Sequence, residues 1–231
     1  MVGASSGIGC ATATILAAAG ARVMAAARRI ERLRSWQDEI RATGLDAHAA
    51  MVDVTDRARV DRLVAETASL FGHIDIMVYA TGTNIPERAF EVLKPKTWDM
   101  MVATNLTGAF NCTRAVLPLM RQVESGLIVY ISTIAVHLPD LSGAAYQASK
   151  HGLSGLAHAV RQEEKLNGIR TSVVFPGLCR TEMVNRRPVP TPKEVLDQAL
   201  EPEDVAHAVL ALATLPARAV VPELEIVPSR L

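Results

Sequence analysis

Short apolar runs alternate along this chain with longer segments in which apolar residues recur at helical spacing. A short apolar run between polar turns is typical of a buried strand, whereas apolar residues three and four positions apart are typical of an amphipathic helix. The pattern predicts strands at residues 21–26, 47–52, 74–79, 127–132, 171–175 and 224–227. It predicts helices at residues 10–19, 31–42, 56–70, 97–122, 146–166 and 202–214.

This alternation predicts an α/β fold, a doubly wound parallel sheet with helices on both faces. Each helix returns the chain to the end of the sheet where the next parallel strand begins. No linker, repeat or low-complexity tract divides the chain, so a single domain over residues 1–231 is expected. In such sheets, ligands bind at the carboxyl ends of the strands.

Composition narrows the possible partners. The 231 residues are 49% hydrophobic and 21% charged, with 24 basic and 24 acidic residues, which suits one globular domain with a sizeable core. Such a balance offers no basic surface for nucleic acid or an anionic membrane. No signal peptide is visible and no apolar run reaches the ~18–20 residues that cross a bilayer, so a cytoplasmic location is predicted.

Cysteine and histidine usage adds little chemistry. Three cysteines, Cys10, Cys112 and Cys179, show no paired spacing, and their odd number argues against a disulfide framework. The six histidines are not grouped as three or four convergent ligands. No metal site is therefore predicted.

Tyr146 and Lys150 are the most informative pair in the chain. They lie four residues apart in a segment with helical spacing, so their side chains share one face. A phenol has an ordinary pKa of about 10, and a neighbouring ammonium lowers that pKa by favouring the phenolate. The pair predicts a general acid/base for an alcohol or carbonyl oxygen near neutral pH. The plain alternative is two exposed residues on a surface helix.

A glycine-rich turn opens the chain. Residues 3–9 read Gly-Ala-Ser-Ser-Gly-Ile-Gly and lead directly into an alanine-rich helix that ends before Gly20. Glycines at this spacing let the backbone approach a pyrophosphate, and the helix N-terminus offers free N–H groups to its charge. Alone, the turn is equally well interpreted as a plain loop. Together with the downstream Tyr146 and Lys150, it predicts dinucleotide-dependent chemistry.

At this point the chain resembles the short-chain dehydrogenase/reductase family over essentially its whole length. The turn matches the motif Thr-Gly-x-x-x-Gly-x-Gly with Val2 at the Thr position, and the tyrosine and lysine match Tyr-x-x-x-Lys. The family's remaining motifs follow in the expected order, at Asp53, Asn105, Pro176, Gly177 and Thr181.

The resemblance implies a Rossmann-like fold and an enzyme that interconverts a carbonyl and a secondary alcohol of a small substrate by hydride transfer. It implies that Tyr146 is the general acid/base, that Lys150 assists it, and that Asn105 supports a proton relay. The implied cofactor-binding residues are Gly3, Ser5, Ser6, Gly7, Ile8, Gly9, Arg28, Arg29, Asp53, Val54, Ala80, Gly82, Tyr146, Lys150, Pro176, Gly177 and Thr181. The loops expected to border the substrate contain Asn84, Ile85, His137, Leu138, Leu141, Met183 and Arg186.

Charge at the end of the first predicted strand favours NADP(H) over NAD(H). An NAD site usually places a carboxylate there for the ribose 2′-hydroxyl, whereas arginine suits a 2′-phosphate. Here Ala27 takes the acid's place and is followed by Arg28 and Arg29. The alternative is that these arginines only begin a solvated helix.

Two hydroxyls compete for the role of assisting Tyr146. In the family, a serine thirteen residues before the tyrosine polarises the substrate oxygen, and that position here is Thr133, next to Ser132. Neighbours on a strand point to opposite faces, so only one of them faces the site. Spacing favours Thr133, and Ser132 takes over only if the backbone departs from strand geometry.

The chain departs from the family in two places. The family's Asn-Asn-Ala-Gly is replaced by Tyr79-Ala80-Thr81-Gly82, which removes two bracing asparagines. Only Met1 and Val2 precede the glycine turn, where the family has a whole central strand, so we expect a truncated first strand, unpaired inner edges and low stability. These departures leave open a catalytically inactive, nucleotide-binding regulatory protein. Small residues on the Tyr146 helix, taken with the resemblance, also imply a homo-oligomer, either a dimer or a tetramer.

Overall fold

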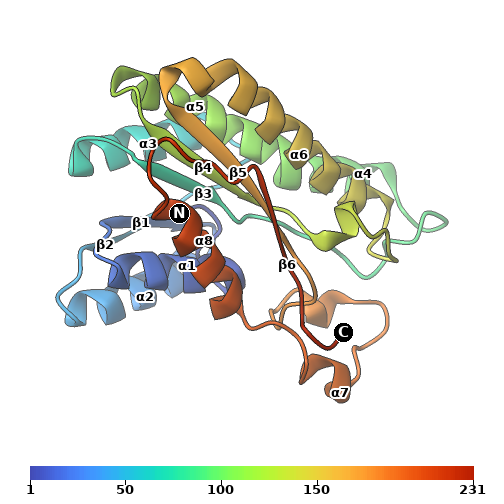
Figure 1. Cartoon of the computed structure of the whole chain (residues 1–231). Helices are drawn as coiled ribbons and strands as arrows, with labels where there is room; N and C mark the ends of the chain where they lie inside the picture. The colour runs from blue at the N-terminus through green and yellow to red at the C-terminus, as the bar shows by residue number, and fades with distance from the viewer.

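The computed structural model describes all residues 1–231 and shows helices on both faces of a parallel sheet (Figure 1). β1 pairs with β2, and a second group pairs in the order β3-β4-β5-β6, with every pair parallel. Each predicted strand is confirmed to within two residues at either end. The strands are β1 Val23–Ala27, β2 Ala47–Met51, β3 Ile76–Tyr79, β4 Gly126–Ile131, β5 Ile169–Pro176 and β6 Glu223–Ile226.

The helices form two layers, each with its own apolar core against the sheet. α1 (Gly7–Ala18), α2 (Ile30–Ala42) and α8 (Pro202–Ala213) cover one face, as Figure 1 shows. The other face is covered by α3 (Arg57–Phe71), α5 (Gly108–Gln122) and α6 (Ala144–Glu164).

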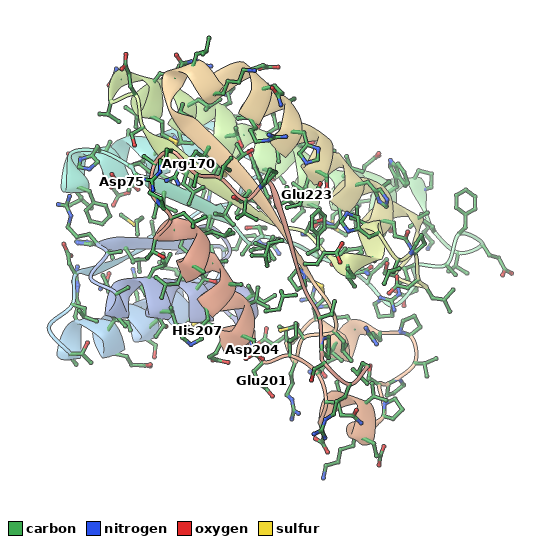
Figure 2. The ribbon with its side chains drawn as sticks, viewed as in Figure 1. Asp75, Arg170, Glu201, Asp204, His207 and Glu223 are labelled. Atoms are coloured by element: carbon green, nitrogen blue, oxygen red, sulfur yellow. The ribbon has the colours of Figure 1, made fainter.

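Of the C-terminal elements, α8 packs against α1 and β6 forms an edge of the sheet beside β5 (Figure 1). α7 (Lys193–Leu196) is a short helix, and α8 begins with reciprocal hydrogen bonds in which the side chains of Glu201 and Asp204 cap backbone N–H groups (Figure 2). None of the helices combines the length and the apolar composition that crossing a membrane requires.

The helix predicted over residues 97–122 is interrupted. It consists of α4 (Pro95–Val102), a π-helical turn (Ala103–Thr107) and α5. Asn105 lies in the π-helical turn with its side chain fully buried. Such turns accommodate an extra residue and occur often at functional sites. The break therefore marks the place where this helix turns a polar side chain towards the interior.

At the centre of the sheet, residues 1–3 connect the two groups of strands through Val2. It forms isolated bridges to Ala26 in β1 and to Tyr79 in β3. Its N–H donates to the Val78 carbonyl at 2.9 Å, and its carbonyl accepts from the Ala80 N–H at 2.8 Å. A mainly apolar cavity of about 310 Å³ lies between β1 and β3 beyond Val2. Val2 thus forms isolated bridges and not a longer strand here, and the low stability stays a prediction.

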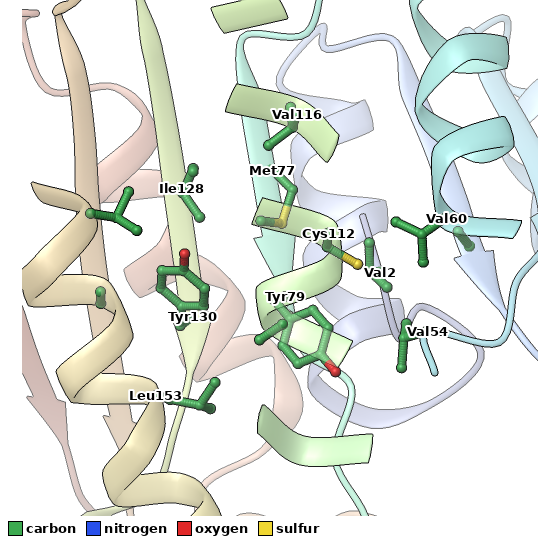
Figure 3. Packing of buried hydrophobic residues seen from close by; sticks show 14 of the residues in the cluster. Val2, Val54, Val60, Met77, Tyr79, Cys112, Val116, Ile128, Tyr130 and Leu153 are labelled. Atoms are coloured by element: carbon green, nitrogen blue, oxygen red, sulfur yellow. The ribbon is translucent and has the colours of Figure 1, made fainter. Parts of the chain in front are cut away.

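Tyr79, which replaces an expected asparagine, is accommodated by its neighbours (Figure 3). Its ring is fully buried and its hydroxyl donates to the Thr104 carbonyl at 2.5 Å, in the π-helical turn. A Cβ at Gly108 would lie 2.6 Å from this hydroxyl and 2.5 Å from a methyl group of Val54, so glycine provides the space. The Tyr79 side chain therefore links the end of β3 to the π-helical turn through this hydrogen bond.

Candidate active site

The glycine turn folds back on itself between Val2 and α1. Gly3 and Gly7 have φ angles of +91° and +54°, in the left-handed region that favours glycine. A Cβ on Gly9 would lie 2.1 Å from the Gly3 carbonyl oxygen, so no larger residue fits this close approach. Ser6, the residue before α1, makes no side-chain cap, which leaves the N–H groups of the first helical turn without an internal acceptor. This cradle suits an anionic phosphate group.

A cavity of about 280 Å³ opens from this turn at the carboxyl ends of the strands. The loops after β1, β2 and β3, together with the end of β4, form its other walls. Of the predicted cofactor residues, all line this cavity except Pro176 and Gly177. Residues that sequence reasoning missed here include Thr81, Thr83, Thr104 and Glu182.

Arg29 is tied to the glycine turn. Its guanidinium donates to the hydroxyls of Ser5 at 3.1 Å and Ser6 at 2.5 Å, and to the Glu182 carboxylate at 2.8 Å. Hydrogen bonds from Arg32 and Arg29 lower the pKa of Glu182 to about 2. The Glu182 carboxylate is therefore ionised and forms ion pairs with both arginines. These contacts favour Arg29 as part of the site over Arg29 as a residue that only begins a solvated helix.

Asp53 stands after β2 on another wall of the same cavity. Its carboxylate accepts from the Thr55 N–H at 3.0 Å and from the Thr55 hydroxyl at 2.7 Å. The backbone hydrogen bond, more than any other contact, lowers the pKa of Asp53. The group is thus held in place as an ionised hydrogen-bond acceptor.

Tyr146 lies in the first turn of α6 at the boundary of two cavities. Burial raises its pKa to about 12, and a hydrogen bond with Thr133 and the positive charges of Arg88 and Arg187 oppose this rise. The net shift of the phenol pKa is therefore upward and not downward as expected from the pairing with Lys150, because removal of the phenol from water dominates.

Lys150 shares the helix face with Tyr146, as the spacing predicted. Its ammonium donates to the Ile131 carbonyl at 2.8 Å and lies 6.0 Å from the centre of the Tyr146 ring. A Cβ at Gly82 would lie 3.2 Å from this nitrogen, so glycine makes room for it. Burial lowers the pKa of Lys150 to about 8. The amine is consequently close to its titration point in neutral to mildly alkaline solution.

The two candidate hydroxyls occupy different positions. Ser132 donates its hydroxyl to the Lys150 carbonyl at 3.2 Å and is buried. Thr133 has extended backbone, and its hydroxyl is the one that interacts with the phenol of Tyr146. Both residues line a cavity at Tyr146, but only the Thr133 hydroxyl contributes to the shift in the Tyr146 pKa. This geometry favours Thr133 for the assisting role.

Asn105 is fully occupied by protein partners. Its side-chain oxygen accepts from the Thr83 N–H at 2.8 Å, and its nitrogen donates to the Thr83 carbonyl at 3.1 Å and to the Ser149 hydroxyl at 3.0 Å. The side chain thus fixes the loop after β3 to α6, although it does not line either cavity. Its predicted part in a proton relay stays a prediction.

A second cavity of about 360 Å³ adjoins the first one at Tyr146. Pro176 and Gly177 line this second cavity and not the first one, which opens from the glycine turn, because the chain turns away after β5. Thr133 and the expected substrate-side residues Asn84, Leu141 and Met183 also line it. Residues that the sequence did not identify as part of this cavity include Arg88, Asp140, Ser142 and Arg187.

Four expected substrate-side residues lie elsewhere. Ile85 lines neither cavity and packs against the small buried cluster that contains Met101 and Tyr146. His137 turns towards β6, where it pairs with Glu225 and its ring packs 4.3 Å from that of Phe175. Leu138 is 67% exposed and does not line the cavity. Arg186 instead donates to the Thr83 hydroxyl at 3.2 Å and lines the first cavity, which opens from the glycine turn. The short 3-10 helix Ile134–Val136 re-aims the chain after Thr133, which residue spacing alone does not reveal.

Because Lys150 is buried, we expect the free energy of unfolding to depend on pH. In the unfolded chain the amine keeps its proton up to a pH of about 10.5, whereas in the folded chain it loses the proton above about 8. Between these values the unfolded state binds more protons, so the free energy of unfolding rises with pH, by about 2 kcal/mol from pH 8 to 10. Lys150→Met removes this rise, which urea unfolding of both proteins at pH 8 and 10 measures. Equal pH dependence in the two proteins contradicts the assignment.

Cavity and side chains together define a class of protein. A glycine cradle with room for a dinucleotide, next to a buried tyrosine and lysine that face a second cavity, is the site of a nucleotide-dependent oxidoreductase. A family model described as short chain dehydrogenase matches residues 1–189. The chain therefore belongs to the short-chain dehydrogenase family and is an enzyme acting on CH–OH donors.

Individual relatives agree with this membership. An uncharacterised oxidoreductase of Staphylococcus haemolyticus is 31% identical, over 99% of this chain and 95% of that protein. A solved metagenomic short-chain oxidoreductase in complex with NADP is 32% identical, with a TM-score of 0.84 over 97% of this chain and 93% of that one. A serine dehydrogenase solved in a closed form with NADP+ is 31% identical, with a TM-score of 0.90 over 98% and 93% of the two chains.

Proposed function

We propose that this protein is an NADP(H)-dependent oxidoreductase that interconverts a carbonyl and a secondary alcohol of a small substrate, with Tyr146 as general acid/base. The observation that carries the proposal is the place of the Tyr146 hydroxyl, at the boundary of the two cavities and next to Thr133. When bound, the nicotinamide supplies or accepts the hydride. The chain's own residues orient the substrate and move the proton.

The proton chemistry follows from burial and charge. Because burial raises the pKa of Tyr146 to about 12, the phenol is protonated at neutral pH and is ready to donate to a developing alkoxide. The Thr133 hydroxyl donates a hydrogen bond to the same oxygen, where negative charge develops. Once Tyr146 has given up its proton, the nearby Lys150 ammonium stabilises the phenolate. In the oxidation direction the same groups act in reverse.

The preference for NADP(H) rests on the arginines after β1. Arg29 is oriented by Ser5 and Ser6 beside the glycine cradle, and Arg28 lines the same cavity without an ion-pair partner. Glu182 forms ion pairs with Arg29 and Arg32 beside the same cradle. A 2′-phosphate at this point meets guanidinium groups that suit its geometry. Two of the similar solved structures are complexes with NADP or NADP+.

Arg29→Gln is expected to lower kcat/KM for NADPH by about 10- to 100-fold, because a charged hydrogen bond is worth about 1.5–3 kcal/mol. The value for NADH should change by less than about threefold. Arg34→Gln is the matched control, since Arg34 lies on α2, is 63% exposed and pairs only with Glu31. Steady-state kinetics with both nucleotides measure the effect. A wild-type preference for NADH argues against the NADP(H) assignment.

The catalytic proposal as a whole is tested by nicotinamide absorbance. The purified chain is mixed with NADP+ and a panel of secondary alcohols, or with NADPH and the corresponding carbonyl compounds. Turnover that depends on protein concentration is expected with at least one small substrate. Nucleotide binding without any turnover instead favours the inactive regulatory protein.

We also propose that the chain assembles as a homo-oligomer, a dimer or a tetramer. Gly155 on α6 faces open space, where a Cβ would meet nothing within 4 Å. On the neighbouring helices α4 and α5, the apolar side chains of Trp98, Met100 and Phe110 are 38%, 39% and 44% exposed. A small-sided helix beside exposed apolar groups supports a contact between copies.

A further inference from the structure

The substrate-side cavity contains buried donors that have no acceptor. The Nε of Arg88 and the hydroxyl of Ser142 are both shielded from solvent and lack a hydrogen-bond partner. Arg187 donates only to the Thr191 hydroxyl, at 3.1 Å. Neither arginine makes an ion pair, although all three residues line the cavity. Buried donors without partners are costly, so their presence together beside Tyr146 calls for an acceptor that the protein itself does not provide.

These donors are held in place by the backbone. Gly143, with a φ of +95°, precedes α6 and packs against the stem of Arg88, because a Cβ there would lie 2.8 Å from the Arg88 Cβ. Asn84 donates to the Ser142 carbonyl at 2.9 Å, which fastens the loop after β3 to the loop before α6. Tyr146 follows Gly143 within one helical turn. Arg88 and Ser142 are therefore fixed relative to the phenol.

The charges in this cavity leave one positive charge uncompensated. Two arginines, Arg88 and Arg187, and one carboxylate, Asp140, are the charged residues that line it. Burial and the repulsion from Arg187 lower the pKa of Arg88, which shows that the two cations lack a sufficient counter-charge. A single negative charge balances this set, whereas a doubly charged phosphate exceeds it. A carboxylate, moreover, matches the planar fork of a guanidinium.

We propose that the substrate is a small hydroxy or oxo monocarboxylate, whose carboxylate is bound by Arg88, Arg187 and Ser142. This assignment rests on the proposed oxidoreductase function, and it names the substrate class of that same site. With the carboxylate on these donors, the remainder of a short acid extends towards Tyr146 and Thr133, which line the same cavity. The positive charge of the two arginines thus selects a carboxylate substrate. The positions of these donors direct the carbon that is oxidised towards Tyr146.

The experiment compares racemic 3-hydroxybutanoate with its methyl ester, which has the same carbinol group and no charge. With NADP+, the wild-type kcat/KM is expected to favour the acid by about tenfold or more. Arg88→Gln should lower the value for the acid by about 10- to 100-fold, mainly through KM, and that for the ester by less than about threefold. Ser142→Ala should show a smaller loss in the same sense. Arg88→Lys, which keeps the charge, should restore part of the preference.

Arg218→Gln is the matched control, because Arg218 is exposed, makes no ion pair and lines neither cavity. It should leave both substrates unaffected. Equal use of acid and ester by the wild-type protein, or an equal loss with both in Arg88→Gln, overturns the carboxylate assignment while leaving the oxidoreductase function intact.

A binding measurement decides the question even without turnover. Isothermal titration of 3-hydroxybutanoate into protein saturated with NADPH forms a complex that cannot react, because both components are already reduced. Binding of the acid that is at least about tenfold weaker in Arg88→Gln than in wild type supports the assignment. Binding that is the same in both proteins refutes it. A chain that shows this difference yet oxidises no alcohol contradicts the proposed function and keeps the carboxylate site.

Discussion

Tyr146→Phe is expected to lower kcat by about 10²- to 10⁴-fold, while the affinity for NADPH stays within about threefold of wild type. The substitution removes only the hydroxyl that donates the proton and leaves the ring that packs at the start of α6. Thr133 remains able to donate a hydrogen bond, so some stabilisation of the alkoxide is retained, but no side chain replaces the lost proton donor. Steady-state turnover and fluorescence titration with NADPH measure the two effects separately.

Tyr130→Phe is the matched control for the loss of a phenol hydroxyl. Tyr130 is fully buried in β4, its hydroxyl pairs with that of Thr113 at 2.7 Å, and it lines neither cavity. The control should lose about 1 kcal/mol of stability and keep its turnover. If Tyr146→Phe turns over as fast as Tyr130→Phe, the proton comes from another group and the proposed mechanism is wrong.

Gly9→Ala is expected to weaken NADPH binding by about 100-fold and to lower the melting temperature. The new Cβ would lie 2.1 Å from the Gly3 carbonyl oxygen and 2.8 Å from its carbonyl carbon, so the turn has to open. These are backbone atoms, which cannot rotate away as a flexible side chain can. Overpacking of this kind costs about 1–3 kcal/mol, and it also displaces the N–H groups that face the phosphates. Titration with NADPH and thermal unfolding measure both effects.

Gly155→Ala tests whether the effect is specific to the cradle. Gly155 lies within α6, and a Cβ there meets nothing within 4 Å. Because Gly155 lines neither cavity, this control should leave the affinity for NADPH within about threefold of wild type. Unchanged nucleotide affinity in Gly9→Ala refutes the assignment of the turn as the phosphate cradle.

Periodicity predicted the strands closely, because β1, β3 and β4 are short apolar runs buried on both faces of the sheet. It missed the break between α4 and α5. The π-helical turn there depends on Asn105 bonding to the backbone of Thr83, a partner twenty-two positions away in the sequence. Helical periodicity describes only which face is apolar, and it carries no information about such a distant partner.

The site, too, has features that local spacing predicts and features that depend on contacts between distant segments. The glycine turn and the pair Tyr146 and Lys150 were predictable, because both depend on spacing within a single element. The pKa of Tyr146 was predicted in the wrong direction, because the Lys150 amine donates to the Ile131 carbonyl and burial outweighs its charge. Arg88 was missed because the loop after β3 reaches the cavity only by packing against Gly143.

The sequence by itself determined the order of strands and helices, the glycine cradle and the helix face shared by Tyr146 and Lys150, because these follow from local spacing and backbone freedom. Only the tertiary structure decided which groups lose contact with water and which charges face one another, as at Arg88 and Arg187. Desolvation and Coulomb interactions depend on distances between segments far apart in the chain. The acidity of the tyrosine and the charge of the second cavity therefore emerge only when those segments pack together.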